Sequence, residues 1–214
     1  MTPFGQLRGS GTGLGTTALI LGGIMLLIQF YAAGLDSAGE LLFYRHFALN
    51  PALVAAAVEG RAPLAAALWP FFTSLFLHDG WFHLFNNLLF LAIFGTLVER
   101  HLGGRRLLAL FFVCGLSGSL LQVLIPHDGG PPAALVVGAS GGLFGLMGAA
   151  FTCGTPALRS GSPQRRLLIV LVVLNALLGL VSASGLLGSL LLIGWQSHLG
   201  GFLAGLCLGR LARP

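Results

Sequence analysis

The chain has 214 residues, of which 56% are hydrophobic and only 8% are charged. Soluble domains carry about 25% charged residues, so this composition excludes an ordinary soluble domain and predicts a polytopic membrane protein. The net charge of +5 does not indicate a nucleic-acid-binding protein, because all eleven basic residues are arginines that cluster near the ends of apolar segments, where they determine topology.

Six apolar segments predict membrane helices, which form one all-α polytopic bundle over residues 1–214. The predicted helices cover about residues 17–34, 81–98, 107–125, 140–154, 167–182 and 195–211. The first segment also has features of a signal peptide, but no clear A-x-A cleavage site follows it and the topology requires it, so we expect it to be retained. We expect three buried free thiols, because no metal-ligand spacing links Cys114, Cys153 and Cys207.

The arginines orient these helices in the membrane. Nine of the eleven fall on one side of a six-helix bundle, at the two chain ends and in the connections after helices two and four. The positive-inside rule therefore predicts cytoplasmic N- and C-termini. Residues 35–80 form a long outer connection that is apolar but interrupted by charges and prolines, so we expect it to lie in the interface rather than to span.

Three polar residues lie near the outer ends of the predicted helices. Counted at 1.5 Å per residue from the inner helix ends, Asn87 and His198 lie roughly 18 Å and Ser140 roughly 21 Å above the inner boundary. In a hydrocarbon core of about 30 Å, this depth is about 10 Å below the outer surface. Polar groups there are costly and are therefore functional candidates. A helix beginning at Ser140 is too short to span, so the chain before it must descend in a non-helical form.

The chemistry of these residues is that of a serine hydrolase. Ser140 is the candidate nucleophile and His198 the candidate base. No Asp or Glu accompanies His198 on its helix, which predicts a dyad rather than a triad. The Ser140 N–H lies at a predicted helix N-terminus, where unpaired donors favour an anion. His83 and Asn87, four residues apart on one helix face, are further candidate donors to an oxyanion.

Glycines near both candidate residues allow close helix packing; these are Gly138, Gly141, Gly201 and Gly205. Ordinary packing explains the glycines alone, and interhelical hydrogen bonds explain Asn86 and Asn87. The remaining alternative is a metal or haem site formed by His78, His83 and His198. Each feature alone is weak evidence, and only their combination favours a hydrolase.

The combination resembles the rhomboid intramembrane serine proteases over about residues 65–212. The stretch from His78 through His83 to Asn87 is similar to that family's second-helix motif. Glu99 to Gly103 resembles its E-x-x-x-G turn. Two further matches are Gly138-Ala139-Ser140-Gly141, which resembles G-x-S-G, and His198-x-x-Gly201-x-x-x-Gly205, which resembles the family's base motif.

The resemblance implies a six-transmembrane-helix rhomboid-like fold and an oxyanion hole formed by the Ser140 N–H, His83 and Asn87. It implies that His78 is a structural or water-organising residue and that Phe144 stacks on the base. The family often has Trp-Arg before the second helix, whereas this chain has Trp69-Pro70. Residues 183–194 would form a cap over the site, and the fifth helix a lateral gate. No cofactor and no metal are implied.

The resulting prediction is a serine endopeptidase of the bacterial plasma membrane, with its site open to the extracytoplasmic side. Its partners would be the lipid bilayer and single-pass transmembrane substrates, preferably with helix-weakening residues and a small residue before the cut. The first alternative is an inactive rhomboid-like protein that binds membrane clients. A haem-binding or transport protein is the second. The sequence predicts neither a particular substrate nor an oligomeric state.

Overall fold

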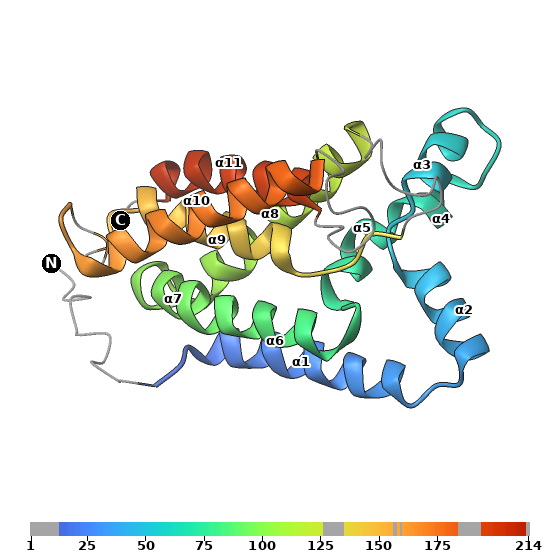
Figure 1. Cartoon of the computed structure of the whole chain (residues 1–214), viewed down its shortest axis with the longest axis horizontal. Helices are drawn as coiled ribbons and strands as arrows, with labels where there is room; N and C mark the ends of the chain where they lie inside the picture. Colours follow the sequence, from blue (N-terminus) through green and yellow to red (C-terminus); the bar gives the residue numbers. More distant parts are fainter. Residues whose placement is uncertain (1–12, 126–134, 156–157, 159, 184–193, 213–214) are drawn as a thin grey trace, which may run out of the picture.

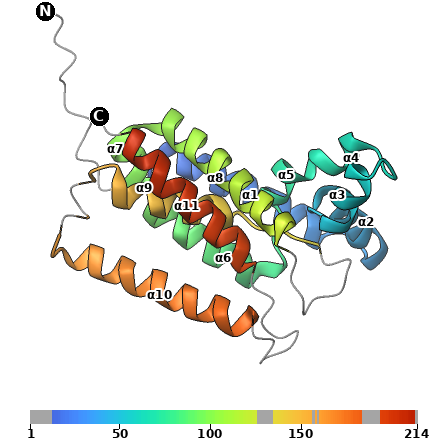
Figure 2. The same cartoon turned by 90° about the horizontal axis from the view of Figure 1, so that it is seen from above.

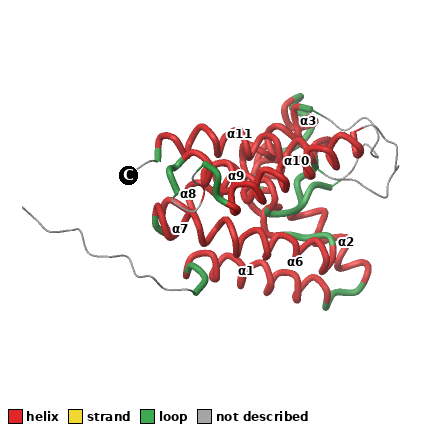
Figure 3. The backbone as a smooth tube through the Cα atoms, turned by 60° about the vertical axis from the view of Figure 1, so that its left-hand side comes forward, coloured by secondary structure: helices red, strands yellow, loops and turns green. Residues whose placement is uncertain are grey.

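The computed structural model describes residues 13–125, 135–155, 158, 160–183 and 194–212, and within them the regular structure is helical apart from one isolated β-bridge (Figures 1 and 3). Each predicted helical segment is helical, with boundaries that move by at most four residues. The helices are α1 (Thr16–Ala33), α6 (Gly80–Phe90) continued by a π-helical turn (Leu91–Gly95) and α7 (Thr96–Leu102), α8 (Gly104–Leu124), α9 (Ser140–Thr152), α10 (Pro163–Ala183) and α11 (Trp195–Leu211).

Three helices in the described part of the chain are long and apolar enough to cross a membrane. They are α1 with 18 residues, the continuous helix Gly80–Leu102 with 23, and α8 with 21. The protein is therefore an integral membrane protein. α9 has only 13 residues, and residues 141–150 are all buried, because α6, α7, α8 and α11 pack around it. A helix too short to span is thus enclosed by protein.

Glycine allows α9 and α11 to pack with their backbones in contact. A Cβ at Gly201 would overlap the carbonyl oxygen of Gly141, and a Cβ at Gly205 would overlap that of Gly145. The same face of α11 brings Gly209 against α9, so the close approach extends over two helical turns beyond Gly201. Figure 2 shows α8, α9 and α11 side by side, with α10 apart from them.

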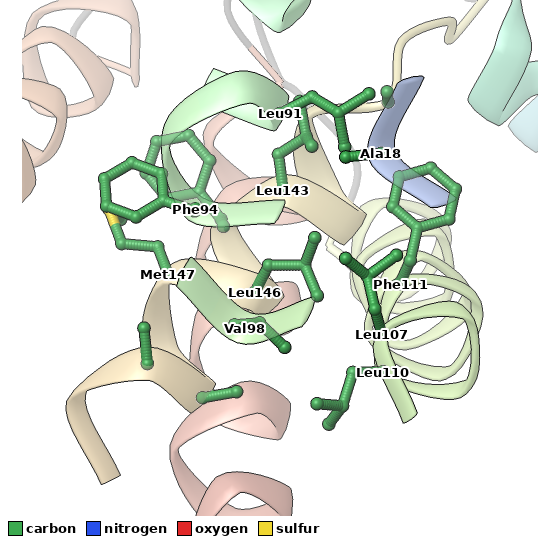
Figure 4. Close-up of a cluster of buried hydrophobic side chains, with 14 of the residues drawn as sticks. Ala18, Leu91, Phe94, Val98, Leu107, Leu110, Phe111, Leu143, Leu146 and Met147 are labelled. Carbon is green, nitrogen blue, oxygen red and sulfur yellow. The ribbon is translucent and has the colours of Figure 1, made fainter. Parts of the chain in front are cut away.

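An apolar cluster fills the space between these helices (Figure 4). Leu91, Phe94 and Val98 come from the long second membrane helix, Leu107 and Phe111 from α8, and further side chains from α9, namely Leu143, Leu146 and Met147. All of them are at most 2% exposed. The centre of the helical bundle is therefore closely packed and rigid.

The outer connection consists of short helices: α2 (Ser37–Phe47), α3 (Pro51–Val58), α4 (Leu64–Leu68) and α5 (Pro70–Thr73), followed by a 3₁₀ turn (Ser74–Phe76). The longest continuous helical stretch there is the apolar run Leu64–Phe76, which is shorter than the helices that are long enough to span. The place of residues 35–80 in the interface stays a prediction. Asp36 and Asn50 begin α2 and α3 by accepting backbone N–H groups.

Pro70 has a structural role where the related motif carries Arg. It is the first residue of α5, a position at which the missing N–H costs nothing. The preceding Trp69 packs against His46 and Phe47, with ring centroids 4.8 and 4.9 Å away. Aromatic packing onto α2 therefore holds the connection at the point where Arg is absent.

The prediction for the cysteines is wrong at one position. Cys114 and Cys153 are buried free thiols, but Cys207 is exposed. The buried positions of α11 are Gln196, Ser197 and the glycines at 200, 201, 205 and 209. Cys207 follows Gly205 by two residues, which is about 200° around the helix, and therefore faces away from the bundle.

The carboxylate of Glu99 joins the beginning of α1 to the end of α7. Its two oxygens accept the backbone N–H groups of Thr17 and Ala18 at 2.9 and 3.0 Å. These donors belong to the first turn of α1, where no intrahelical acceptor exists. Gly104 allows the approach, because a Cβ there would overlap the Thr17 hydroxyl.

We expect Glu99→Gln to lower the free energy of unfolding by about 1–3 kcal/mol, because the amide nitrogen of Gln would face an N–H donor and leave it unsatisfied. Thermal unfolding in detergent micelles would measure the change. The control is Glu59→Gln, which removes the same charge from an exposed residue that pairs with exposed Arg61 and should cost less than about 0.5 kcal/mol. Equal losses in both variants would contradict a specific role for Glu99.

Candidate active site

The chain that leads to Ser140 is extended, and its backbone is paired with the outer connection. Leu49 and Val136 exchange two hydrogen bonds, of 3.0 Å from the Leu49 N–H and 2.8 Å from the Val136 N–H. The Gly138 N–H donates to the Ser74 carbonyl at 2.9 Å. Non-helical backbone at membrane depth is stable only when its polar groups have partners, and these bonds provide them.

Gly138 turns this chain into α9. Its φ of +123° is one that side-chain-bearing residues rarely adopt. A Cβ at Gly138 would lie 2.9 Å from both Cε1 and Nε2 of His83 and 3.7 Å from the Ser140 hydroxyl oxygen. The edge of the His83 ring and the Ser140 hydroxyl therefore border the same small space in front of Gly138.

The hydrogen bond to His83 indicates which ring nitrogen carries the proton. The Asp79 N–H donates to His83 Nδ1 at 3.4 Å, which makes Nδ1 an acceptor. In a neutral imidazole the proton then lies on Nε2, the nitrogen that faces Gly138. His83 therefore presents an N–H donor to the space beside Ser140.

His198 is held by α9, one helical turn after Ser140. The imidazole stacks on the Phe144 ring with centroids 4.3 Å apart and planes inclined by 8°. Phe144 in turn stacks on Phe90 of α6 at 5.9 Å. Ser140 and Phe144 are four residues apart and share a face of α9, so the stack brings the imidazole to the serine's side of the helix.

Asn87 is buried, one turn after His83 on α6. Its amide nitrogen donates to the His83 carbonyl at 2.9 Å, and the side chain is 4% exposed. This bond uses one of the two amide N–H groups. The residue therefore lies on the face of α6 that carries His83.

His78 is 1% exposed, and neither ring nitrogen hydrogen-bonds to another residue that the structure describes. The Tyr44 hydroxyl donates to the backbone carbonyl of His78 at 2.5 Å. The His78 ring meets the His83 ring edge-on, with the ring centroids 5.1 Å apart. Burial, together with the nearby His83, lowers the pKa of His78 to about 3, so the imidazole is neutral at pH 7. A neutral ring with one donor and one acceptor suits a bound water.

A family model of the Rhomboid domain matches residues 65–214. This range includes the candidate site residues His78, His83, Asn87, Ser140 and His198. The chain belongs to the rhomboid family.

Three relatives show the range of this family. RHOMBOID-like protein 5 of Arabidopsis thaliana is 32% identical over 163 residues, which cover 74% of this chain and 49% of that protein. Rhomboid-like protease 3 of Toxoplasma gondii is 32% identical over 143 residues, 66% of this chain and 50% of that protein. Inactive RHOMBOID-like protein 8 of Arabidopsis thaliana is 37% identical over 82 residues, 38% of this chain and 22% of that protein.

The chain thus spans half or less of the length of these relatives. Rhomboids are generally intramembrane serine proteases, and the family includes inactive members. This rhomboid is accordingly an intramembrane protease or an inactive rhomboid-like protein.

The structure brings the predicted site residues of this rhomboid into two groups. Gly138, Ser140 and His83 border one space, while Phe144, one turn after Ser140 on α9, stacks on His198 of α11. Within the described ranges, no three His, Cys, Asp or Glu side chains are arranged to hold a metal ion, so the three histidines do not form a ligand set. The predicted cap falls almost entirely on residues 184–193, outside the described part.

Sequence reasoning missed the residues that support the site from the outer connection. Leu49 and Ser74 hydrogen-bond to the chain that leads to Ser140, and Tyr44 to the backbone of His78, and each of these partners is at least 34 positions away in sequence. Leu49 pairs with a residue 87 positions later, and it sits in no motif. Leu49 differs from most of the outer connection in being fully buried, which only the structure shows.

Proposed function

We propose that this rhomboid is an intramembrane serine endopeptidase that uses Ser140 and His198 as a dyad. The observation that supports it most is the space beside Gly138, where the Ser140 hydroxyl, a helix N-terminus and the Nε2 edge of His83 converge. A nucleophile and oxyanion donors around one point are what peptide-bond cleavage requires.

In this mechanism Ser140 Oγ attacks the scissile carbonyl while His198 takes its proton. The oxyanion that forms is stabilised by the Ser140 N–H and the Nε2–H of His83, with Asn87 on the same helix face. When the C–N bond breaks, His198 returns the proton to the leaving amine. Water then attacks the acyl-enzyme, with His198 again accepting a proton, and Ser140 is restored. No cofactor or metal takes part.

The proposed substrates are single-pass transmembrane proteins. A helical peptide buries its carbonyls in hydrogen bonds, so the segment that reaches Ser140 must unwind, which residues with low helix propensity favour. We also propose six membrane spans over residues 1–214, cytoplasmic termini and a site that opens to the outer side, supported by the arginine distribution. A bacterial plasma membrane remains our expectation from the sequence.

The test uses the purified protein in detergent and in proteoliposomes. It is incubated with model transmembrane substrates and with a fluorophosphonate probe, and the labelled peptide is identified by mass spectrometry. We expect cleavage of substrate and labelling at Ser140. A cooperatively folded protein that neither cleaves nor labels would instead support the inactive, client-binding function that one relative's name suggests.

A further inference from the structure

Two adjacent asparagines on α6 have the same local hydrogen bond but different surroundings. The amide nitrogen of Asn87 donates to the His83 carbonyl at 2.9 Å, and that of Asn86 donates to the Phe82 carbonyl at 2.8 Å. Asn87 is buried, whereas Asn86 is exposed. The catalytic proposal uses Asn87 and leaves Asn86 without a role.

Helix geometry places Asn86 on the flank of α6 next to the site and away from α1. Successive residues turn by about 100°. Asn87 lies on the face of α6 that carries His83. The next residue, Leu88, is turned by about 100° from that face and packs toward Gly22 of α1. One step back from Asn87 leads to Asn86, on the opposite flank, with exposed Leu89, three residues further on, as its neighbour on the same side. Figure 2 shows α10 on the side of α6 that lies away from α8.

An amide on this flank is costly unless it has a partner. Its exposed neighbours along α6 are apolar, including Phe82 at 84% and Leu89 at 56% exposed, and Leu has a higher helix propensity than Asn. The bond to Phe82 uses one N–H, and a primary amide has a second N–H and a carbonyl oxygen with two lone pairs. A polar group facing apolar surroundings in a membrane helix indicates a function.

We propose that Asn86 is a substrate-positioning residue that hydrogen-bonds the backbone of the unwound segment beside the scissile bond. An unwound segment exposes N–H and C=O groups that lipid cannot satisfy. The Asn86 amide offers a donor and an acceptor to such a backbone, whatever its side chains are. Asn86 is turned by about 100° from the face of α6 that carries His83 and Asn87. In this proposal the peptide passes Asn86 on its way to Ser140. This inference rests on the proposed endopeptidase function.

The test compares wild type with Asn86→Leu and Asn86→Gln in proteoliposomes. Two rates are measured: kcat/KM for a transmembrane substrate, and fluorophosphonate labelling of Ser140, which needs no substrate backbone. We expect Asn86→Leu to lower kcat/KM about tenfold while labelling stays unchanged, as for one lost hydrogen bond to a backbone group. Asn86→Gln, which keeps the amide, should recover part of the loss. Leu89→Ile on the same flank is the apolar control and should cleave at the wild-type rate.

A second substrate series identifies the bonded group. Backbone amides near the cleavage site are replaced one at a time by esters, which lack the N–H. At the position bonded to Asn86, wild type and Asn86→Leu should cleave the ester substrate equally. Equal kcat/KM of both enzymes for the all-amide substrate would overturn the role of Asn86, as would a parallel fall in the labelling rate. Wild type that neither labels nor cleaves would overturn the endopeptidase itself.

Discussion

Ser140→Ala is expected to abolish cleavage of transmembrane substrates, with a loss of about 10⁵-fold or more in the single-turnover rate. Alanine cannot form the acyl-enzyme, and no neighbouring hydroxyl replaces it at the start of α9, where the next residues are Gly141 and Gly142. His198→Ala should cost a similar factor, because the serine hydroxyl is a weak nucleophile without a base.

The double variant separates a dyad from two independent effects. Residues that act as one unit are not additive, so Ser140→Ala combined with His198→Ala should be no slower than either change alone. Ser117→Ala is the matched control, because Ser117 is a half-buried serine on α8, outside the proposed site, whose hydroxyl donates to the Val113 carbonyl at 2.8 Å. It should cleave within a few-fold of wild type. Cleavage by Ser140→Ala at the wild-type rate would assign the nucleophile to another residue.

Gly138→Ala should lower the cleavage rate about 100-fold or more while most of the protein stays folded. The added Cβ would meet Cε1 and Nε2 of His83 at 2.9 Å, so either the ring or the chain before Ser140 must move. Both movements separate His83 from the space beside the serine hydroxyl. Removing one oxyanion donor alone costs about 10²–10³-fold in kcat.

Gly154→Ala is a control that also places alanine at a positive φ but brings its Cβ against no other residue. Gly154 has a φ of +86°, comparable in kind to Gly138, but a Cβ there meets nothing within 4 Å. Both variants should lose some stability in thermal unfolding, by about 1–2 kcal/mol at Gly154 and by more at Gly138, whose φ of +123° lies further from the region that alanine tolerates. Only Gly138→Ala should lose activity. An equal loss of cleavage in both would show that strain in general, and not the displacement of His83, is responsible.

The helices and their order follow from local features of the sequence. Apolar length, interrupted by arginines and by glycines such as Gly103, sets the helix ends to within a few residues, because each boundary depends on residues close by in the chain. The short α9 is equally local, since Gly138 provides the positive φ from which the helix begins at Ser140. The motif spacings likewise identify the candidate site residues from sequence.

Only the tertiary structure determined how those residues are supported. The Leu49–Val136 bridge, the Tyr44 bond to His78 and the Glu99 bonds to α1 join segments 34 to 87 positions apart, and no periodic pattern encodes such pairs. The exposed position of Cys207 and the difference between Asn86 and Asn87 depend on which face of a helix meets its neighbours. Apolar content alone does not distinguish protein-facing from lipid-facing positions in a membrane helix, because both environments are apolar.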